Sequence, residues 1–124
     1  MKRLFISCAL LSLLAGCASN DIIDPHGYDQ TGVASYYGAK HHGKRTASGE
    51  AFNQHSLTAA HRQLPFGTRV MVTNLKNAKS CVVRINDRGP HIRGRLIDVS
   101  REAAERLGML SSGTARVRIQ ALDD

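Results

Sequence analysis

Apolar and polar residues alternate along several short segments of this chain, a period typical of β-strands with one face on a core. The pattern predicts a hairpin in which segment 68–75 pairs with segment 80–86. In the second segment Cys81, Val83 and Ile85 occupy alternate positions, so we expect the Cys81 thiol to face the core. Further strands are expected over residues 31–37, 95–99 and 114–120.

One short helix is expected between the last two of these strands. Ser100 can act as an N-cap because its hydroxyl accepts from the free N–H groups of a first helical turn, and Gly108 is a stop signal. Together they predict a helix over residues 101–107. Many short strands with one helix favour an all-β fold, a small β-barrel. The 124 residues leave room for one domain.

The N-terminal residues differ from the rest of the chain. A short basic start, which includes Lys2 and Arg3, precedes an apolar run over residues 4–15. Such a run is shorter than the roughly 20 residues of a membrane span and is typical of a secretory signal. We therefore predict a signal peptide over residues 1–16. An ordinary signal peptide followed by a chance cysteine is the alternative to the lipoprotein signal described next.

The residues around Cys17 resemble the lipobox of bacterial lipoproteins, in which small residues precede a cysteine that is lipidated, as in Leu14-Ala15-Gly16-Cys17. The resemblance implies acyl chains on Cys17, which hold the protein to a membrane facing the periplasm. Ala18 then points to the outer membrane. We expect a tether over residues 17–30 and a domain over residues 31–122.

Charge and cysteine content limit which partners and which folds are possible. The formal charge of +7 falls to +5 when Lys2 and Arg3 leave with the signal peptide. Export makes nucleic acid an unexpected partner, so anionic wall polymers and lipid head groups are the candidates, or the charge only solvates the surface. Cys81 is the one free thiol expected in the mature chain. Without a disulfide, a small domain depends on its core, which suits a closed barrel.

Seven ordered blocks resemble the rare lipoprotein A family over residues 32–122. The resemblance implies a six-stranded double-psi β-barrel, a fold shared with expansins, and the activity of a peptidoglycan lytic transglycosylase. Barwin-like defence modules are not favoured because their disulfides are missing. The blocks are GVASYYG (32–38), GKRTASGE (43–50), LTAAH (57–61), LPFGT (64–68), RINDRGP (84–90), GRLIDVS (94–100) and AA with LGM (103–109).

Two departures from the family pattern affect the expected function. Tyr36 or Tyr37 stands where the family commonly has tryptophan, which keeps an aromatic platform for a sugar ring. Long members also carry a C-terminal domain that binds peptide-free glycan, whereas this sequence ends at Asp124. We therefore expect any glycan preference to come from the barrel.

Glycosidic cleavage requires a proton donor and stabilisation of an oxocarbenium-like transition state. In a lytic transglycosylase the C6 hydroxyl of N-acetylmuramic acid replaces water, so one carboxyl can serve as acid and then as base. The resemblance assigns catalysis chiefly to Glu50 and Asp87, with His61 in support, and aligns Asp98 with an aspartate important in expansins. Glu102 and Glu105, on the expected helix, are surface charges.

Neighbouring residues suggest how the two favoured acids differ. Burial beside Phe52 would raise the pKa of Glu50, whereas Arg84 and Arg88 would lower that of Asp87. On this basis Glu50 is the proton donor and Asp87 the charged stabiliser, with the reverse assignment left open. The candidate substrate-binding residues are Tyr36, Tyr37, Thr46 and Arg88.

Each catalytic candidate also has a structural alternative. Asp87 can cap a turn and Glu50 can be a solvated loop acid. Asp98 can favour the following helix N-terminus, and His61 can be a buried structural histidine.

The histidines lack metal-ligand spacing, so no metal and no cofactor is expected. The expected partners are glycan strands and the membrane, the expected state is a monomer, and the rival function is a non-catalytic, expansin-like peptidoglycan-binding lipoprotein.

Overall fold

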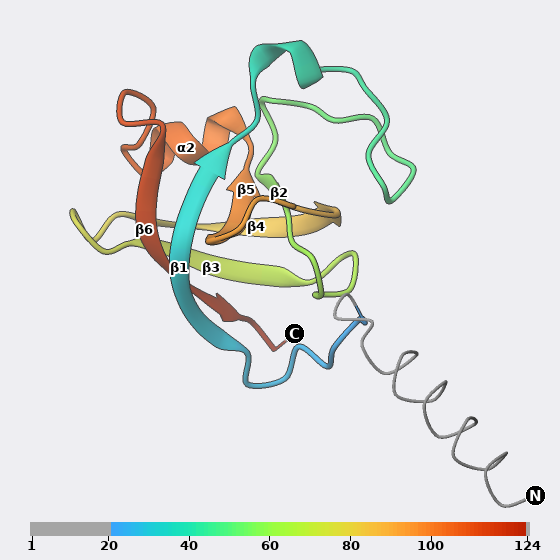
Figure 1. Ribbon diagram of the computed structural model, residues 1–124, viewed down its shortest axis with the longest axis horizontal. Helices are drawn as coiled ribbons and strands as arrows, with labels where there is room; N and C mark the ends of the chain where they lie inside the picture. Colours follow the sequence, from blue (N-terminus) through green and yellow to red (C-terminus); the bar gives the residue numbers. More distant parts are fainter. Residues whose placement is uncertain (1–20, 124) are drawn as a thin grey trace, which may run out of the picture.

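Six strands close into one barrel in the computed structural model, which describes residues 21–123 (Figure 1). The predicted signal peptide over residues 1–16 and the lipidation site Cys17 lie outside the described residues. The strands are β1 (Asp29–Tyr36), β2 (Thr58–Ala60), β3 (Arg69–Asn74), β4 (Ser80–Asp87), β5 (Arg95–Val99) and β6 (Thr114–Ala121), joined by a short 3₁₀ turn, η1 (Ala39–His41), and one helix, α2 (Arg101–Arg106).

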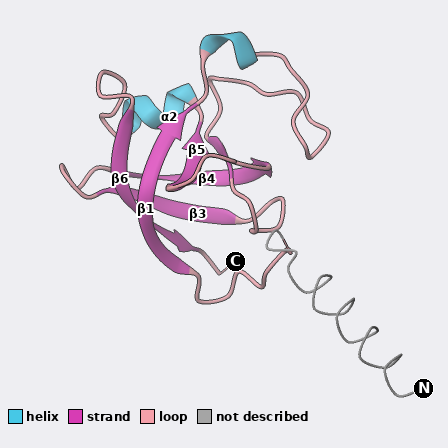
Figure 2. Ribbon diagram, in the orientation of Figure 1, coloured by secondary structure: helices cyan, strands magenta, loops and turns pink. Residues whose placement is uncertain are grey.

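The strands follow the order β1-β5-β2-β4-β3-β6 around the barrel, which closes where β6 pairs with β1. Two neighbouring pairs, β1–β5 and β2–β4, are parallel, and the other four are antiparallel. Figure 2 shows that α2 and η1 are the helical parts of an otherwise β structure with long loops. The all-β expectation with one short helix is confirmed.

In each parallel pair, one residue of one strand has no partner on the other strand, as in a β-bulge. In β1–β5, Val33 pairs with Arg95 and Ala34 with Ile97, which leaves Leu96 over. In β2–β4, Ala59 pairs with Ile85 and Ala60 with Asp87, which leaves Asn86 over. An extra residue of this kind shifts the alternation of everything after it, so the following side chains change face.

The interior of the barrel is apolar and tightly filled. Its residues come from all six strands and from the inner side of α2. Cys81, Val83 and Ile85 lie among them, which confirms the inward direction expected for that strand. Burial raises the pKa of the Cys81 thiol, so it remains protonated and packs as a small apolar group.

Three elements differ most from the expected ones: β1, β2 and the helix. β1 begins at Asp29, and Ile23 and Tyr28 pack against the core, so ordered structure starts within the segment expected to be a tether. β2 was not expected, because three residues are too short for a visible alternation, and all three are buried. The helix ends at Arg106, one residue early, with Leu107 as its C-cap. Among residues 21–123 no helix has the length and apolar character needed to cross a membrane.

Candidate active site

Two aspartates flank β2 on the outer face of the barrel. Ala60 of β2 pairs with Asp87 of β4 on one side and with Asp98 of β5 on the other. Residues paired across neighbouring strands share a face of the sheet, so both carboxylates lie on the same side. If side chains alternated strictly along β4 from Ile85 and along β5 from Arg95, Asp87 and Asp98 would face the core. The unpaired residues Asn86 and Leu96 shift this alternation, so both aspartates face outward.

Asp98 is held on one oxygen only. The hydroxyl of Ser35, its partner across β1–β5, donates a hydrogen bond to Oδ1. The Arg95 guanidinium lies 3.5 Å from the same oxygen, and 23% of the Asp98 side chain is exposed. Among the described residues no hydrogen bond engages Oδ2, so that oxygen remains available to a substrate.

Asp87 is held on both oxygens. Oδ1 accepts from the backbone N–H groups of Ala47 and Arg88, each at 2.9 Å. Oδ2 accepts from the Tyr37 hydroxyl at 2.6 Å. Because Ala47 and Tyr37 come from different loops, the Asp87 carboxylate also fastens these loops to the end of β4.

Tyr37 links the two aspartates. Its ring stacks on the buried Phe52, with ring centroids 4.3 Å apart, and its hydroxyl faces Asp87. Burial is the largest cause that raises the pKa of Tyr37, followed by the hydrogen bond and the charge of Asp87 and then by the charge of Asp98. The phenol therefore keeps its proton and serves as a donor to Asp87.

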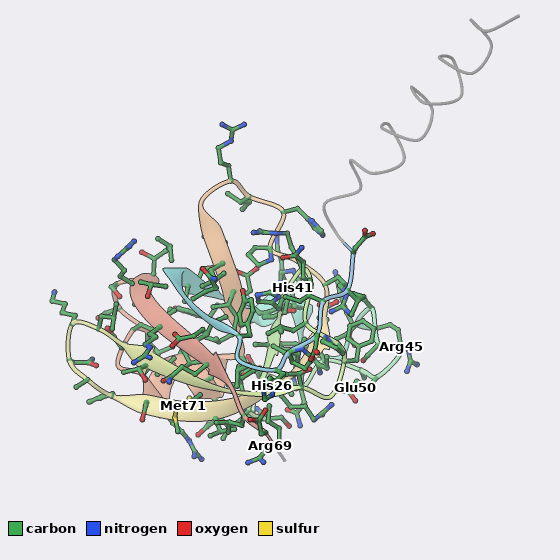
Figure 3. The ribbon with its side chains drawn as sticks, turned by 90° about the horizontal axis from the view of Figure 1, so that it is seen from below. His26, His41, Arg45, Glu50, Arg69 and Met71 are labelled. Carbon is green, nitrogen blue, oxygen red and sulfur yellow. The ribbon has the colours of Figure 1, made fainter. Side chains whose placement is uncertain are left out.

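Glu50 lies beside this pair, in a loop that folds onto the end of β4. Its Oε1 accepts from Arg84 Nη2 at 2.9 Å and from Asn86 Nδ2 at 2.5 Å, and Oε2 accepts from Arg84 Nη1 at 3.3 Å. The loop is fastened by Thr46, whose hydroxyl donates to the Glu50 carbonyl, and by Ser48 N–H, which donates to the Asn86 carbonyl. Figure 3 shows Glu50 close to Arg45 at one edge of the molecule.

The expected rise in the pKa of Glu50 was wrong. The hydrogen bonds from Arg84 and then Asn86 lower the pKa of Glu50, and burial opposes them only weakly because 42% of its side chain is exposed. Arg84 therefore pairs with Glu50 and not with Asp87. The Arg88 guanidinium donates to backbone carbonyls, while its backbone N–H donates to the Asp87 carboxylate.

Arg88 and His61 form the base of the site. The Arg88 guanidinium donates to the His61 and Leu64 carbonyls and lies 3.9 Å from the Phe66 ring centroid. His61 is buried, and its Nδ1 accepts from the backbone N–H groups of Gln63 and Leu64. With Nδ1 as acceptor, Nε2 carries the proton and donates to the Tyr28 hydroxyl, 2.9 Å away.

Burial, followed by the positive charges of Arg62 and Arg88, lowers the pKa of His61 to about 4. Both ring nitrogens are occupied within the fold, and neither contacts a carboxylate. The structural alternative for His61 therefore fits the contacts better than direct catalysis.

Two of the candidate binding residues serve the fold. The Tyr36 hydroxyl donates to the Leu110 carbonyl at 2.9 Å, which directs this ring away from Asp87, whereas Tyr37 faces it. Thr46 is buried within its own loop. Sequence reasoning missed Ser35 and Asn86, which orient Asp98 and Glu50; both lie within quoted family blocks, but a lone Ser or Asn carries no local signal. Within residues 21–123, His, Cys, Asp and Glu side chains form no group of three arranged to hold a metal.

A family model described as "Lytic transglycolase" matches residues 29–119, which include Glu50, Asp87 and Asp98. The chain belongs to that family. The match also agrees with the closed six-stranded barrel, so the expected double-psi fold is confirmed.

Curated relatives of this family are similar over most of the barrel. The chain is 62% identical over 88 residues to the "Probable endolytic peptidoglycan transglycosylase RlpA" of Synechocystis, an alignment that covers 71% of this chain and 27% of that protein. It is 48% identical over 109 residues to the "Endolytic peptidoglycan transglycosylase RlpA" of Vibrio cholerae, covering 88% and 41%. The chain therefore spans less than half the length of these relatives.

Solved structures share the fold at low sequence identity. The Streptomyces papain inhibitor matches with a TM-score of 0.61 at 22% identity, covering 78% of this chain and 96% of that one. An expansin of Clavibacter michiganensis, solved in complex with cellohexaose, also matches with a TM-score of 0.61, at 18% identity, covering 78% and 52%. These likenesses concern the barrel alone.

Proposed function

We propose that this chain is a peptidoglycan lytic transglycosylase that cleaves glycan strands and leaves 1,6-anhydro-N-acetylmuramic acid ends. The relatives' names and the family support this activity. The structural observation that carries the proposal is the placement of Asp87 and Asp98 on either side of Ala60. The Tyr37 hydroxyl donates to Asp87, and the charges of both aspartates act on it.

In the proposed reaction Asp98 transfers the proton. Its Oδ2 has no hydrogen-bond partner among the described residues, and 23% of the side chain is exposed, whereas both oxygens of Asp87 accept hydrogen bonds. In this assignment the Asp98 carboxyl gives a proton to the glycosidic oxygen as the C1–O bond breaks. The C6 hydroxyl of the muramic acid residue then attacks C1 and returns its proton to Asp98.

Asp87 and Glu50 supply fixed negative charge near the developing cation. Asp87 is oriented by two backbone N–H groups and by Tyr37, and Glu50 is kept ionised by Arg84 and Asn86. Preoriented charges of this kind stabilise a transition state without reorganising during the reaction. This assignment removes the proton-donor role from Glu50, because an acid with a lowered pKa is a poor donor near neutral pH.

The cellular setting is part of the same proposal. The sequence features of residues 1–16 and Cys17 support secretion and lipidation, and Ala18 supports the outer membrane. We propose a monomer on the periplasmic surface of that membrane, with glycan strands as its substrate. Replacement of Cys17 by Ser should abolish incorporation of a clickable fatty acid, and persistent labelling of that variant would place the anchor elsewhere.

The activity is tested by incubating the full chain with purified peptidoglycan glycan strands and analysing the products by mass spectrometry. Anhydromuramyl ends are expected, and they should disappear in Asp98→Asn. Products with reducing ends would indicate hydrolysis in place of transglycosylation. Strand binding without any cleavage would support the alternative, an expansin-like binding lipoprotein, which the shared barrel fold with an expansin allows.

A further inference from the structure

The exposed apolar side chains of the barrel are unevenly distributed. Four large ones are exposed among the described residues: Ile22 at 52%, Phe66 at 42%, Leu75 at 49% and Ile92 at 56%. Ile22, Phe66 and Ile92 all adjoin the turn over residues 61–66. Leu75 lies apart from them, in the loop between β3 and β4.

Hydrogen bonds join the three segments that carry these residues. The Ile23 N–H, next to Ile22, donates to the Gln63 carbonyl at 2.9 Å. The Arg62 guanidinium donates to the Pro90 and Arg95 carbonyls at 2.8 and 2.9 Å, so it fastens the loop between β4 and β5 that exposes Ile92. The loop is therefore a fixed projection of the barrel.

Cations surround these apolar residues. Arg88 stacks on Phe66, Arg62 lines a hollow of about 430 Å³ together with Ile92 and Arg93, and no ion pair engages these three arginines among residues 21–123. The acids near these residues include Asp21 and Asp24, which flank Ile22 in sequence, and Asp87, whose charge acts on Arg88. We call this surface the apolar-basic face: Ile22, Phe66, Ile92, Arg62, Arg88 and Arg93.

Ile22 of this face follows Cys17 closely in sequence. Four peptide units separate Cys17 from Asp21, which can span at most about 14 Å. Figure 3 shows the loop between β4 and β5 rising at the same edge of the molecule as the first described residues, while Glu50 lies away from that edge. A barrel held by so short a segment has a membrane within reach of this face.

We propose that the apolar-basic face rests on the anionic surface of the bilayer that holds the lipid on Cys17, with Ile92 entering the head-group region. The inference rests on the lipidation proposed above. Exposed aliphatic groups among arginines suit an interface in which apolar side chains meet acyl chains and guanidinium groups meet lipid phosphates.

The chain contains no tryptophan, so a single introduced tryptophan reports on its own surroundings. Ile92→Trp is compared with Leu75→Trp, a matched exposed apolar position away from the face. Each full-length variant is reconstituted into vesicles of phosphatidylethanolamine and phosphatidylglycerol, with and without brominated acyl chains. We expect Trp emission at position 92 to shift to shorter wavelength and to be quenched by the bromines, and emission at position 75 to stay unchanged.

A second substitution tests the charge. Arg93→Gln in the Ile92→Trp chain should lower the ratio of docked to undocked barrel about fivefold. Replacing phosphatidylglycerol by phosphatidylcholine should have the same direction of effect.

The outcomes separate the anchor from the face. If the chain sediments with the vesicles but position 92 is no better quenched than position 75, the face does not dock although the anchor holds. If the chain washes off the vesicles, the lipidation proposal and this one fall together. If emission at position 92 responds to glycan strands and not to lipid, the face contacts glycan and the proposal is wrong.

Discussion

Each of the two parallel strand pairs contains a β-bulge, and the extra residue has a different role in each pair. In β1–β5 the extra residue is Leu96, which packs against the core beside Gly32. In β2–β4 the extra residue is Asn86, which hydrogen-bonds Glu50 in the neighbouring loop. Both bulges turn an aspartate to the outer face, Asp98 in the first pair and Asp87 in the second.

The difference shows how a symmetric framework yields an asymmetric site. The apolar extra residue packs against the core on its side of the barrel, and Asp98 keeps one carboxylate oxygen without a hydrogen-bond partner among the described residues. The polar extra residue recruits the loop that carries Thr46 and Glu50, and this loop covers Asp87. One aspartate is thus exposed to substrate, whereas the other is held from several sides.

The largest expected effect tests the different roles of the two aspartates, Asp98 and Asp87. Asp98→Asn should lower the rate of anhydromuramyl product formation by about 10³-fold, because it removes the group that transfers the proton. Asp87→Asn, the matched change on the other pair, should cost about 10²-fold through lost charge stabilisation. Initial rates on glycan strands measure both, and unchanged thermal unfolding is the control. A larger loss for Asp87→Asn would reverse the two roles.

The second effect concerns His61, which extends β2 beyond Ala60. Its folded pKa of about 4 lies below the unfolded value near 6.5, so the unfolded chain binds the proton first. Above pH 6.5 neutral His61 makes its full contribution to the free energy of unfolding. This contribution decreases by about 3 kcal/mol as the pH falls toward 4. Urea unfolding across this range should show a shallower pH dependence in His61→Asn, which keeps an acceptor for the turn.

His26→Gln is the control for that measurement, since the His26 side chain is 79% exposed and has no comparable burial. Carboxylates also titrate near the lower end of the range, so the difference between variants is the quantity to compare. Equal slopes in wild type and His61→Asn would show that burial does not hold this imidazole neutral.

A third prediction tests the β-bulge at Leu96 in the β1–β5 pair. A Cβ at Gly32 would lie 2.9 Å from Leu96 Cβ, closer than side chains normally approach. Gly32→Ala should therefore destabilise the barrel by about 2 kcal/mol through overpacking. The control is Gly38→Ala, whose nearest new contact is 3.9 Å away. Chemical denaturation decides the point, and equal midpoints for both variants would show that the β1–β5 bulge tolerates a larger residue.

The smallest expected effect tests the β-bulge at Asn86 in the β2–β4 pair. Asn86→Ala removes one donor from Glu50 while Arg84 remains, so the pKa of Glu50 should rise. The loss of about one hydrogen bond should slow product formation about fivefold. An NMR titration of the Glu50 carboxyl carbon measures the first effect. An unchanged titration curve would mean that Arg84 alone sets the charge of Glu50.

Sequence reasoning located the barrel strands with recognisable alternation and missed β2. The hairpin of β3 and β4 was predicted with its inward face, including Cys81, because pairing between near neighbours in sequence leaves a period of two. β2 has three residues that are all buried, so it shows no alternation, and only its position between β4 and β5 makes it a strand.

The candidate site was predicted in composition more than in arrangement. Glu50, Asp87 and Asp98 were named from the family resemblance, and the structure places the aspartates on a common face. Their electrostatics could not be read from neighbours in sequence. Arg84 is three residues from Asp87 but reaches across to Glu50, because alternation along β4 and the fold of the Glu50 loop place them together.

The sequence by itself determined which residues of β3 and β4 face the core, where α2 begins at its Ser100 cap, and which carboxylic acids are available for chemistry. These properties depend on local period and local hydrogen bonds. Tertiary structure alone decided that Asp87 and Asp98 point outward, that Glu50 is ionised by Arg84, and that His61 is sealed by Tyr28. Each of these depends on strand register or on contacts between distant segments, and register in a parallel pair is set by the whole closed barrel.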